Sequence, residues 1–100
     1  MQAKFGIIEI PRSIDSAREN ARLAEEHGFD IVGVADSQSL FRELFVTLSV
    51  IGSATGRVGL GPTVTNPLTR HPAVMASGLA SIQEISGGRA FLGIATGDSA

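Results

Sequence analysis

Four short apolar runs alternate with three longer segments of helical character, and this alternation limits the possible folds more than any other feature of the chain. Each run is rich in Ile, Val, Leu or Ala and stops at a Pro, a Gly or a polar cluster, as buried strands do. The expected strands are residues 4–10, 31–35, 57–62 and 89–95. Because parallel strands are joined by right-handed helical crossovers, the order β-α-β-α-β-α-β predicts an α/β fold with a parallel sheet.

The three expected helices differ in how they divide polar and apolar residues. The first has Ser13 or Ser16 as its N-cap, ends at Gly28 and carries its charges on one face, as an outer-layer helix does. Helices 41–54 and 72–85 are apolar nearly all round. Such helices are covered on both sides, either by more chain or by another subunit. We expect a homo-oligomer that forms through these two helices.

The composition excludes several classes of function. One hundred residues, 43% hydrophobic and 18% charged, allow one domain with a core of its own. The net charge of −2 argues against nucleic-acid binding. No apolar run reaches the roughly 18 residues of a membrane span, and no histidine cluster indicates a metal site. The lack of cysteine and of a signal-peptide pattern favours a cytoplasmic protein.

The segment 57–72, RVGLGPTVTNPLTRHP, contains the most polar loop in its half of the chain. It begins as the third expected strand, continues as a loop of Thr, Asn, Arg and His side chains, and ends where Pro72 opens the next helix. Ligands in parallel α/β folds bind just beyond the carboxyl ends of the strands. The sequence therefore predicts a small-molecule site at this loop.

Four segments of the chain resemble a known family, and as a set they are specific although each one alone is weak. They are ARLAEEHGFDIVGVAD (21–36), GPTVTNPLTRHP (61–72), ASIQEISGGR (80–89) and FLGIATGDS (91–99). In these segments the chain resembles the N-terminal part of the bacterial-luciferase-like superfamily of flavin- and deazaflavin-dependent oxidoreductases. It is most similar to the coenzyme F420-dependent branch that includes methylenetetrahydromethanopterin reductase.

This resemblance implies a fold and an activity. Residues 1–100 would be the first four βα units of a (β/α)8 TIM barrel, which is about a third of a typical member. The intact enzyme would move a hydride between reduced F420, or FMN, and a small organic substrate. With FMN as the cofactor, oxygen activation becomes possible and the enzyme would be a luciferase-like monooxygenase.

Two alternatives come from the residues themselves. The piece is either catalytic or a non-catalytic half-barrel that associates with itself through its apolar helices and open sheet edges. A Rossmann domain has the same element order, but the third glycine and the acidic partner of its fingerprint are missing after Gly59 and Gly61.

The candidates for cofactor binding follow the third and fourth expected strands. The resemblance implies that the loop after the third strand backs the cofactor ring, with a cis peptide bond between Thr63 and Val64. Asn66 can donate and accept hydrogen bonds, which suits a ring edge, although a turn before Pro67 would also explain it. The complete set is Thr63, Val64, Thr65, Asn66, Thr96 and Gly97.

The catalytic candidates are three carboxylates at strand ends: Asp98, Asp36 and Glu9. The resemblance places Asp98, within TGD, near the reacting face, where a carboxyl of raised pKa could relay protons. It matches Asp36 to a family aspartate that could contact substrate or ring, with helix capping or loop hydrogen bonding as the alternative. Whether Glu9 points into the site depends on which face of the sheet its position in the strand presents. A loop salt bridge is the alternative for both Glu9 and Asp98.

Three neighbouring polar residues have other expected roles. Many family members have a histidine after the aspartate, and some sugar-phosphate dehydrogenases use it in catalysis. Ser37 stands there in this chain, which argues against histidine-dependent chemistry. Arg70 and His71 match the family motif RHP, and we expect them to fix the loop against the next helix.

Overall fold

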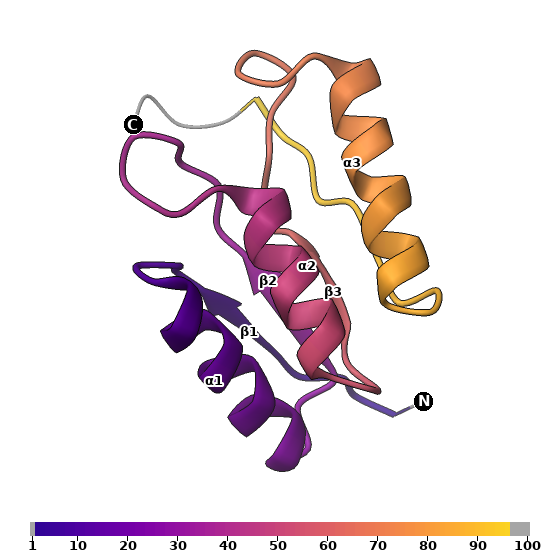
Figure 1. Cartoon of the computed structure of the whole chain (residues 1–100). Helices are drawn as coiled ribbons and strands as arrows, with labels where there is room; N and C mark the ends of the chain where they lie inside the picture. Colours follow the sequence, from indigo (N-terminus) through magenta and orange to yellow (C-terminus); the bar gives the residue numbers. More distant parts are fainter. Residues whose placement is uncertain (1, 97–100) are drawn as a thin grey trace.

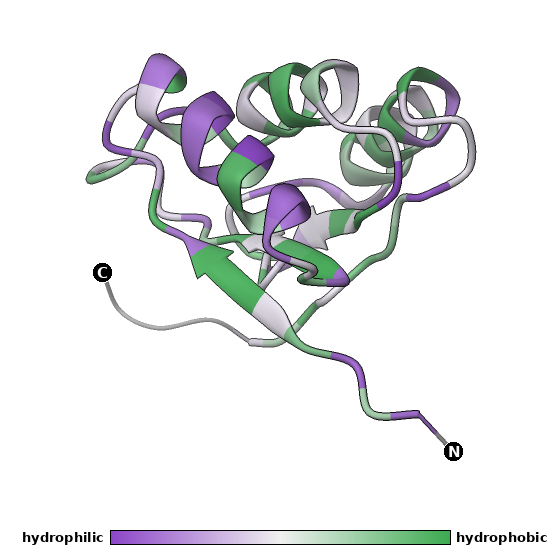
Figure 2. Cartoon of the chain, turned by 90° about the horizontal axis from the view of Figure 1, so that it is seen from below, coloured by the Kyte–Doolittle hydropathy of each residue, from purple (hydrophilic) through white to green (hydrophobic). Residues whose placement is uncertain are grey.

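The computed structural model describes residues 2–96, which form a parallel sheet and a layer of helices (Figure 1). The strands are β1 Gly6–Glu9, β2 Ile31–Val34 and β3 Gly59–Pro62, and the helices are α1 Ile14–Glu26, α2 Leu44–Ala54 and α3 Pro72–Ile85. All three helices lie on the same side of the sheet (Figure 2). The α/β class predicted from the alternation of strands and helices is confirmed.

The sheet has the order β1-β2-β3, and each strand is parallel to its neighbour. Ile8 pairs with Gly33, and Gly33 pairs with Gly61, so one cross-strand row carries two glycines. A Cβ atom on Gly33 would overlap the side chain of Thr63, and one on Gly61 would overlap the carbonyl oxygen of Phe91. The two glycines therefore let the loop after β3 and the segment around Phe91 lie directly against the sheet.

The fourth strand, predicted over residues 89–95, is present only as an extended segment with two isolated bridges. Leu60 bridges Ala90 and Thr65 bridges Ile94, both in the parallel direction. Five residue steps separate Leu60 from Thr65, whereas four separate Ala90 from Ile94. Residues 60–65 therefore contain one residue more than a regular ladder accommodates. The direction of pairing is as predicted, but this bulge interrupts the ladder, and the prediction of a continuous fourth strand is wrong.

Capping side chains set where the helices begin and end. The Ser13 hydroxyl accepts a backbone N–H of the first turn of α1 at 3.0 Å, and Gly28, at φ +85°, follows its last turn, both as predicted. α2 begins at Leu44 instead of residue 41. The reason is that the Glu43 carboxylate accepts the N–H of Val46 at 2.8 Å and so caps the helix at that point.

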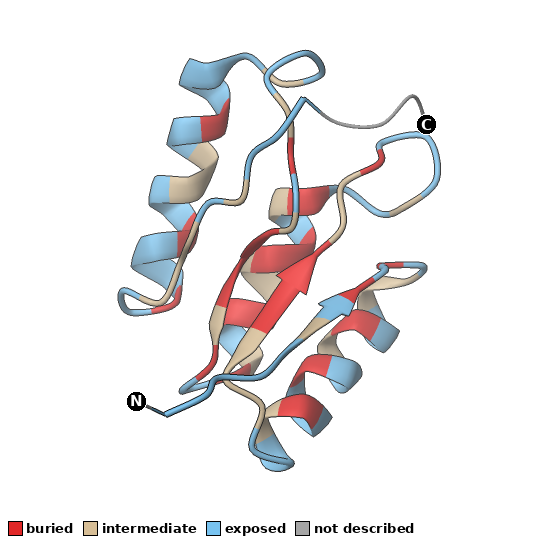
Figure 3. Ribbon diagram, turned by 180° about the vertical axis from the view of Figure 1, so that it is seen from behind, coloured by how far each residue is buried: buried red, intermediate tan, exposed pale blue. Residues whose placement is uncertain are grey.

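The core lies between the sheet and the helices. Small side chains bring α1 close to the sheet, and longer aliphatic side chains of α2 fill the space beside it. The buried apolar residues are Ala17, Ala21, Ala24, Val32, Val34, Leu44, Leu48, Ile51, Val58, Leu60, Met75 and Ile82. Viewed from the face without helices, burial is high in β2 and β3 and lower in β1 (Figure 3).

The two apolar helices pack against each other, and α3 keeps the more exposed surface. The Phe45 ring of α2 lies against Gly78 of α3, where a Cβ atom would be 3.0 Å from the ring. The buried residues of α3 are Met75 and Ile82, whereas Val74 is exposed. Within residues 2–96, no helix combines the length and the hydropathy of a bilayer-crossing segment.

Arg89 ties the carboxyl-terminal ends of α2 and α3 to the start of β3. Its guanidinium donates to the carbonyl oxygens of Gly52, Thr55 and Val58 at 2.9 Å each. Its Nε donates to the carbonyl oxygen of Ser86 at 2.6 Å. The cation thus meets the negative ends of two helix dipoles, and the planar fork of arginine reaches acceptors in several directions at once.

Glu25 of α1 fixes the turn that leads into β3. Its carboxylate accepts the backbone N–H groups of Gly56, Arg57 and Val58 at distances of 2.6 to 3.1 Å. Burial acts to raise the pKa of Glu25, but these three donors and the Arg57 charge outweigh it, so its pKa lies below the ordinary value. The first helix and the third strand are therefore connected through an ionised side chain.

Replacing Arg89 by lysine is expected to lower the free energy of unfolding by about 3 kcal/mol, because one ammonium group leaves buried carbonyl oxygens unpaired. Urea unfolding followed by circular dichroism measures the change. Arg12, which is exposed, gives the matched control, and Arg12→Lys should change stability by less than about 0.5 kcal/mol. Equal losses in both variants would contradict this role of Arg89.

Candidate functional site

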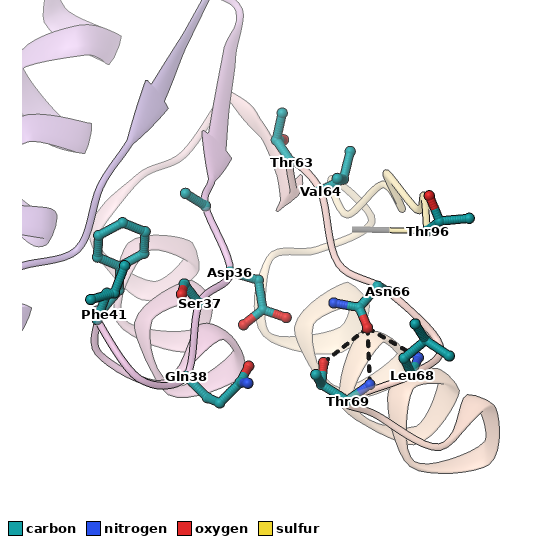
Figure 4. Close-up of a pocket in the computed structure, with 12 residues that line it drawn as sticks. Asp36, Ser37, Gln38, Phe41, Thr63, Val64, Asn66, Leu68, Thr69 and Thr96 are labelled. Carbon is teal, nitrogen blue, oxygen red and sulfur yellow. Dashed lines mark hydrogen bonds between the residues drawn. The ribbon is translucent and has the colours of Figure 1, made fainter. Parts of the chain in front are cut away.

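A pocket of about 330 Å³ opens at the carboxyl ends of β2 and β3 (Figure 4). This is the edge of the sheet at which parallel α/β folds bind ligands, and the volume falls at the lower end of the roughly 300–1,000 Å³ typical of small-molecule sites. The residues that line it come from the ends of β2 and β3, the loops that follow them and the end of the described chain. They are Ala35, Asp36, Ser37, Gln38, Leu40, Phe41, Thr63, Val64, Asn66, Leu68, Thr69 and Thr96.

Thr63 and Val64 form one wall of the pocket. The peptide bond between them is cis, as predicted. The Val64 side chain is half-exposed and offers apolar surface to a ligand. The Thr63 hydroxyl donates to the carbonyl oxygen of Gly61 at 3.4 Å, so its own oxygen remains free to accept a hydrogen bond. An apolar surface beside a polar atom suits the face and the edge of a flat ring.

Asn66 forms the turn around Pro67 that the sequence offered as an alternative to ring binding. Its Oδ1 accepts the backbone N–H groups of Leu68 and Thr69 at 3.0 and 2.9 Å, and the Thr69 hydroxyl at 3.1 Å. Figure 4 shows its Nδ2 on the side of the pocket that faces Asp36. Because the oxygen is committed to the turn, Asn66 can offer a ligand only a donor.

Asp36 is held in a buried ion pair. Its side chain is 2% exposed, and its oxygens accept Nε and Nη2 of Arg70 at 3.0 and 3.1 Å and the Thr65 hydroxyl at 2.8 Å. Burial acts to raise the pKa of Asp36, but the bonds from Arg70 and Thr65 and the Arg70 charge outweigh it and lower the pKa. The carboxylate thus holds the loop in place, which is the loop hydrogen bonding that the sequence left open, and contact of this pocket-lining residue with substrate or ring stays a prediction.

Thr65, another cofactor-binding candidate, lies outside the pocket lining. Its side chain is fully buried and donates to Asp36. Arg70 and His71 have the structural roles expected of them. Arg70 also binds Glu43 at 2.8 Å, and His71 Nδ1 accepts the first-turn N–H of α3 at 3.0 Å. The loop is therefore fastened at both of its ends.

Glu9 does not line the pocket, and its side chain faces the helix layer. Its carboxylate accepts Asn20 Nδ2 of α1 at 3.1 and 3.3 Å. Burial raises the pKa of Glu9, and the bond from Asn20 opposes this only in part. Since neighbouring residues of a strand point to opposite faces, Ile8, and not Glu9, belongs to the face without helices.

Thr96 lines the pocket, as expected of a cofactor-binding candidate, whereas Gly97 and Asp98 lie outside the described residues. Sequence reasoning missed the rim of the pocket. The rim residues are Gln38, Leu40, Phe41, Leu68 and Thr69. Their only signal was their position in the polar segments directly after β2 and β3.

Comparison with known proteins agrees with this fold. The family model described as luciferase-like monooxygenase matches residues 3–100. The chain is 42% identical over 97 residues to the 5,10-methylenetetrahydromethanopterin reductase of Methanolobus tindarius, a match that covers 96% of this chain and 29% of that enzyme. The coenzyme F420-dependent tetrahydromethanopterin reductase of Methanopyrus kandleri has a similar structure, with a TM-score of 0.93 at 33% identity. That match covers 98% of this chain and 28% of the other.

A further structure shares the fold at lower identity. It is the oxygenating constituent of 3,6-diketocamphane monooxygenase from Pseudomonas putida in complex with FMN, with a TM-score of 0.84 at 24% identity, covering 98% of this chain and 31% of that one. The fold is thus that of a segment of the α/β barrel of flavin- and deazaflavin-dependent enzymes. The chain belongs to the luciferase-like monooxygenase family, and it spans about 29% of the length of the reductase that it matches.

Asp36→Asn is expected to lower the free energy of unfolding at pH 7 by about 2 kcal/mol, because it leaves Arg70 paired only with Glu43. The folded-state pKa of Asp36 is depressed, so its contribution is complete above the unfolded pKa of about 3.9 and is lost as the pH falls through the folded value. Urea unfolding between pH 7 and pH 3 should therefore show the difference from wild type narrowing below about pH 4. Asp15→Asn, at an exposed ion pair, is the control. A penalty that does not vary with pH would contradict the assignment.

Proposed function

We propose that the intact protein is an oxidoreductase that moves a hydride between coenzyme F420, or FMN, and a small organic substrate. The observation that carries this proposal is the pocket formed by Thr63 and Val64 at the end of β3, in a chain of the luciferase-like family. Relatives of the chain include F420-dependent reductases and an FMN-bound monooxygenase. We also propose a cytoplasmic location, which the absence of cysteine favours.

The residues present fit a flavin or deazaflavin ring. Val64 would pack on its face, Thr63 would accept a hydrogen bond at its edge, and Asn66 would donate one. Thr96, which also lines the pocket, would contact the ring, and Gly97 stays a candidate from the family motif alone. When bound, the cofactor supplies the hydride chemistry, and the chain orients it and excludes water.

The proton that accompanies hydride transfer needs a titratable group near the ring. Asp36 is committed to Arg70, and Glu9 faces the helix layer. Asp98 is therefore the carboxylate that we propose for this role, in keeping with the family motif in which it stands.

A luciferase-like monooxygenase with FMN is the second candidate. The FMN complex of the monooxygenase from Pseudomonas putida favours it, whereas the two reductases favour F420. The identity of the cofactor separates these candidates, because reduced FMN activates oxygen and F420 transfers hydride.

Titration of this chain with F420 and with FMN, followed by cofactor fluorescence, should show saturable binding of one of them. Val64→Asp should weaken that binding at least about tenfold, because it puts a charge against the apolar ring face. Leu23→Asp, at a leucine of α1 that is as exposed as Val64 and does not line the pocket, is the matched control and should bind as wild type does. Binding of neither cofactor would contradict a functional ring slot in this chain and favour the non-catalytic half-barrel.

We further propose a homo-oligomer that forms through α2 and α3. Val74 is 64% exposed on α3, and an apolar groove of about 550 Å³ lies between α3 and the extended segment that follows it. The groove is lined by Met75, Ala76, Leu79, Ala80, Leu92 and Ile94, among others. Burial of this surface against a second copy would remove it from water.

Sedimentation velocity should give a dimer or larger species for wild type and a monomer for Val74→Asp, because the new carboxylate would be buried without a partner. Leu68→Asp changes an apolar residue that is 84% exposed but lies outside both helices, and it should leave the oligomer intact. A wild-type monomer would contradict the interface.

A further inference from the structure

Ser37 has a buried hydroxyl with no hydrogen-bond partner among the described residues. The residue is 8% exposed, directly follows Asp36, and lines the pocket at the end of β2 (Figure 4). Within residues 2–96, its Oγ is the one buried side-chain nitrogen or oxygen atom of this kind. Such a hydroxyl destabilises the ligand-free protein, since it has lost its contact with water and gained none in return.

The acceptors of the two nearest polar clusters are already engaged. Both Asp36 oxygens are bonded, to Arg70 and to Thr65, and Asn66 Oδ1 is bonded to its own turn. Since no polar atom within residues 2–96 bonds Ser37 Oγ, a molecule that enters the pocket can supply its partner. A hydroxyl can both donate and accept, so it imposes no fixed polarity on that partner.

The charge of the pocket lining limits which chemical groups of a ligand can bond Ser37. Asp36 is the only charged residue among the described residues that line the pocket. Its partner Arg70 is shared with Glu43, so the cluster of these three side chains has a net negative charge. An anionic group such as a phosphate or a carboxylate would be repelled here, whereas an uncharged carbonyl or amide would not.

We propose that Ser37 is a specificity-determining residue whose hydroxyl hydrogen-bonds an uncharged carbonyl or amide group of the ligand in this pocket. The inference rests on the proposed function, because the polar edge of a flavin or deazaflavin ring has groups of this kind. It predicts that the hydroxyl favours ligand binding while costing stability in the free protein.

The test compares Ser37→Ala with Ser39→Ala, a control in the same turn whose serine is exposed and does not line the pocket. The probes are F420, FMN and lumichrome, the last being the uncharged ring system alone. Fluorescence titration gives the dissociation constants, and thermal unfolding gives the stability of each ligand-free variant. Excess inorganic phosphate is added as a competitor in parallel titrations.

Ser37→Ala should bind the ring probes about tenfold more weakly than wild type, with an unchanged or higher unfolding temperature in the absence of ligand. Ser39→Ala should alter neither quantity, and phosphate should not displace lumichrome. Unchanged affinity of Ser37→Ala, or displacement by phosphate, would overturn the inference and leave the proposed function standing. A lowered unfolding temperature would also overturn it, since the hydroxyl would then have its partner within the protein. If wild type bound none of the ring probes, a functional ring slot in this chain would be contradicted and the inference would fall with it.

Discussion

The guanidinium of Arg89 sits where two helices and a strand come together, and the rest of the layer depends on it. Helix ends leave carbonyl oxygens without intrahelical partners, and burying them is costly. Arg89 meets this requirement for α2 with bonds to Gly52 and Thr55, and it reaches Val58 at the entry to β3. Since Glu25 holds the same turn from the side of α1, two charged side chains fix the start of β3. The far end of that strand, where the pocket lies, is thereby placed on a rigid support.

At the carboxyl ends of β2 and β3, charged side chains also join separate elements, and there they shape the pocket. Asp36 and Arg70 join the end of β2 to the loop after β3, and Glu43 extends the contact to the start of α2. Because both carboxylates pair with Arg70, these charges shape the pocket and leave it a net negative charge but no unpaired side chain. What remains for a ligand is a neutral lining of valine, threonine, asparagine and serine. Such a lining suits recognition by shape and hydrogen bonding.

Local signals predicted the parts of this structure that depend on neighbouring residues. Ser13 and Gly28 mark the ends of α1 by their own chemistry, and the alternation of apolar runs with helices determined the fold class. Glu9 points to the helix layer, and its direction was left open because a shift of one residue in strand phase moves a side chain to the opposite face. The pairing of Asp36 with Arg70 joins residues 34 positions apart, and no local pattern specifies such a partner. The bulge after β3 likewise arises from pairing with residues 90–94.

That bulge has a consequence for how much of the loop a ligand can touch. In a regular strand, two consecutive side chains face opposite ways, so only one of them reaches a given site. The extra residue relaxes this alternation, and Thr63 and Val64 both line the pocket while Thr65 turns inward to Asp36. Chain length in this region is therefore a determinant of the site in its own right. Loss of a single position here would restore the alternation and withdraw half of the wall.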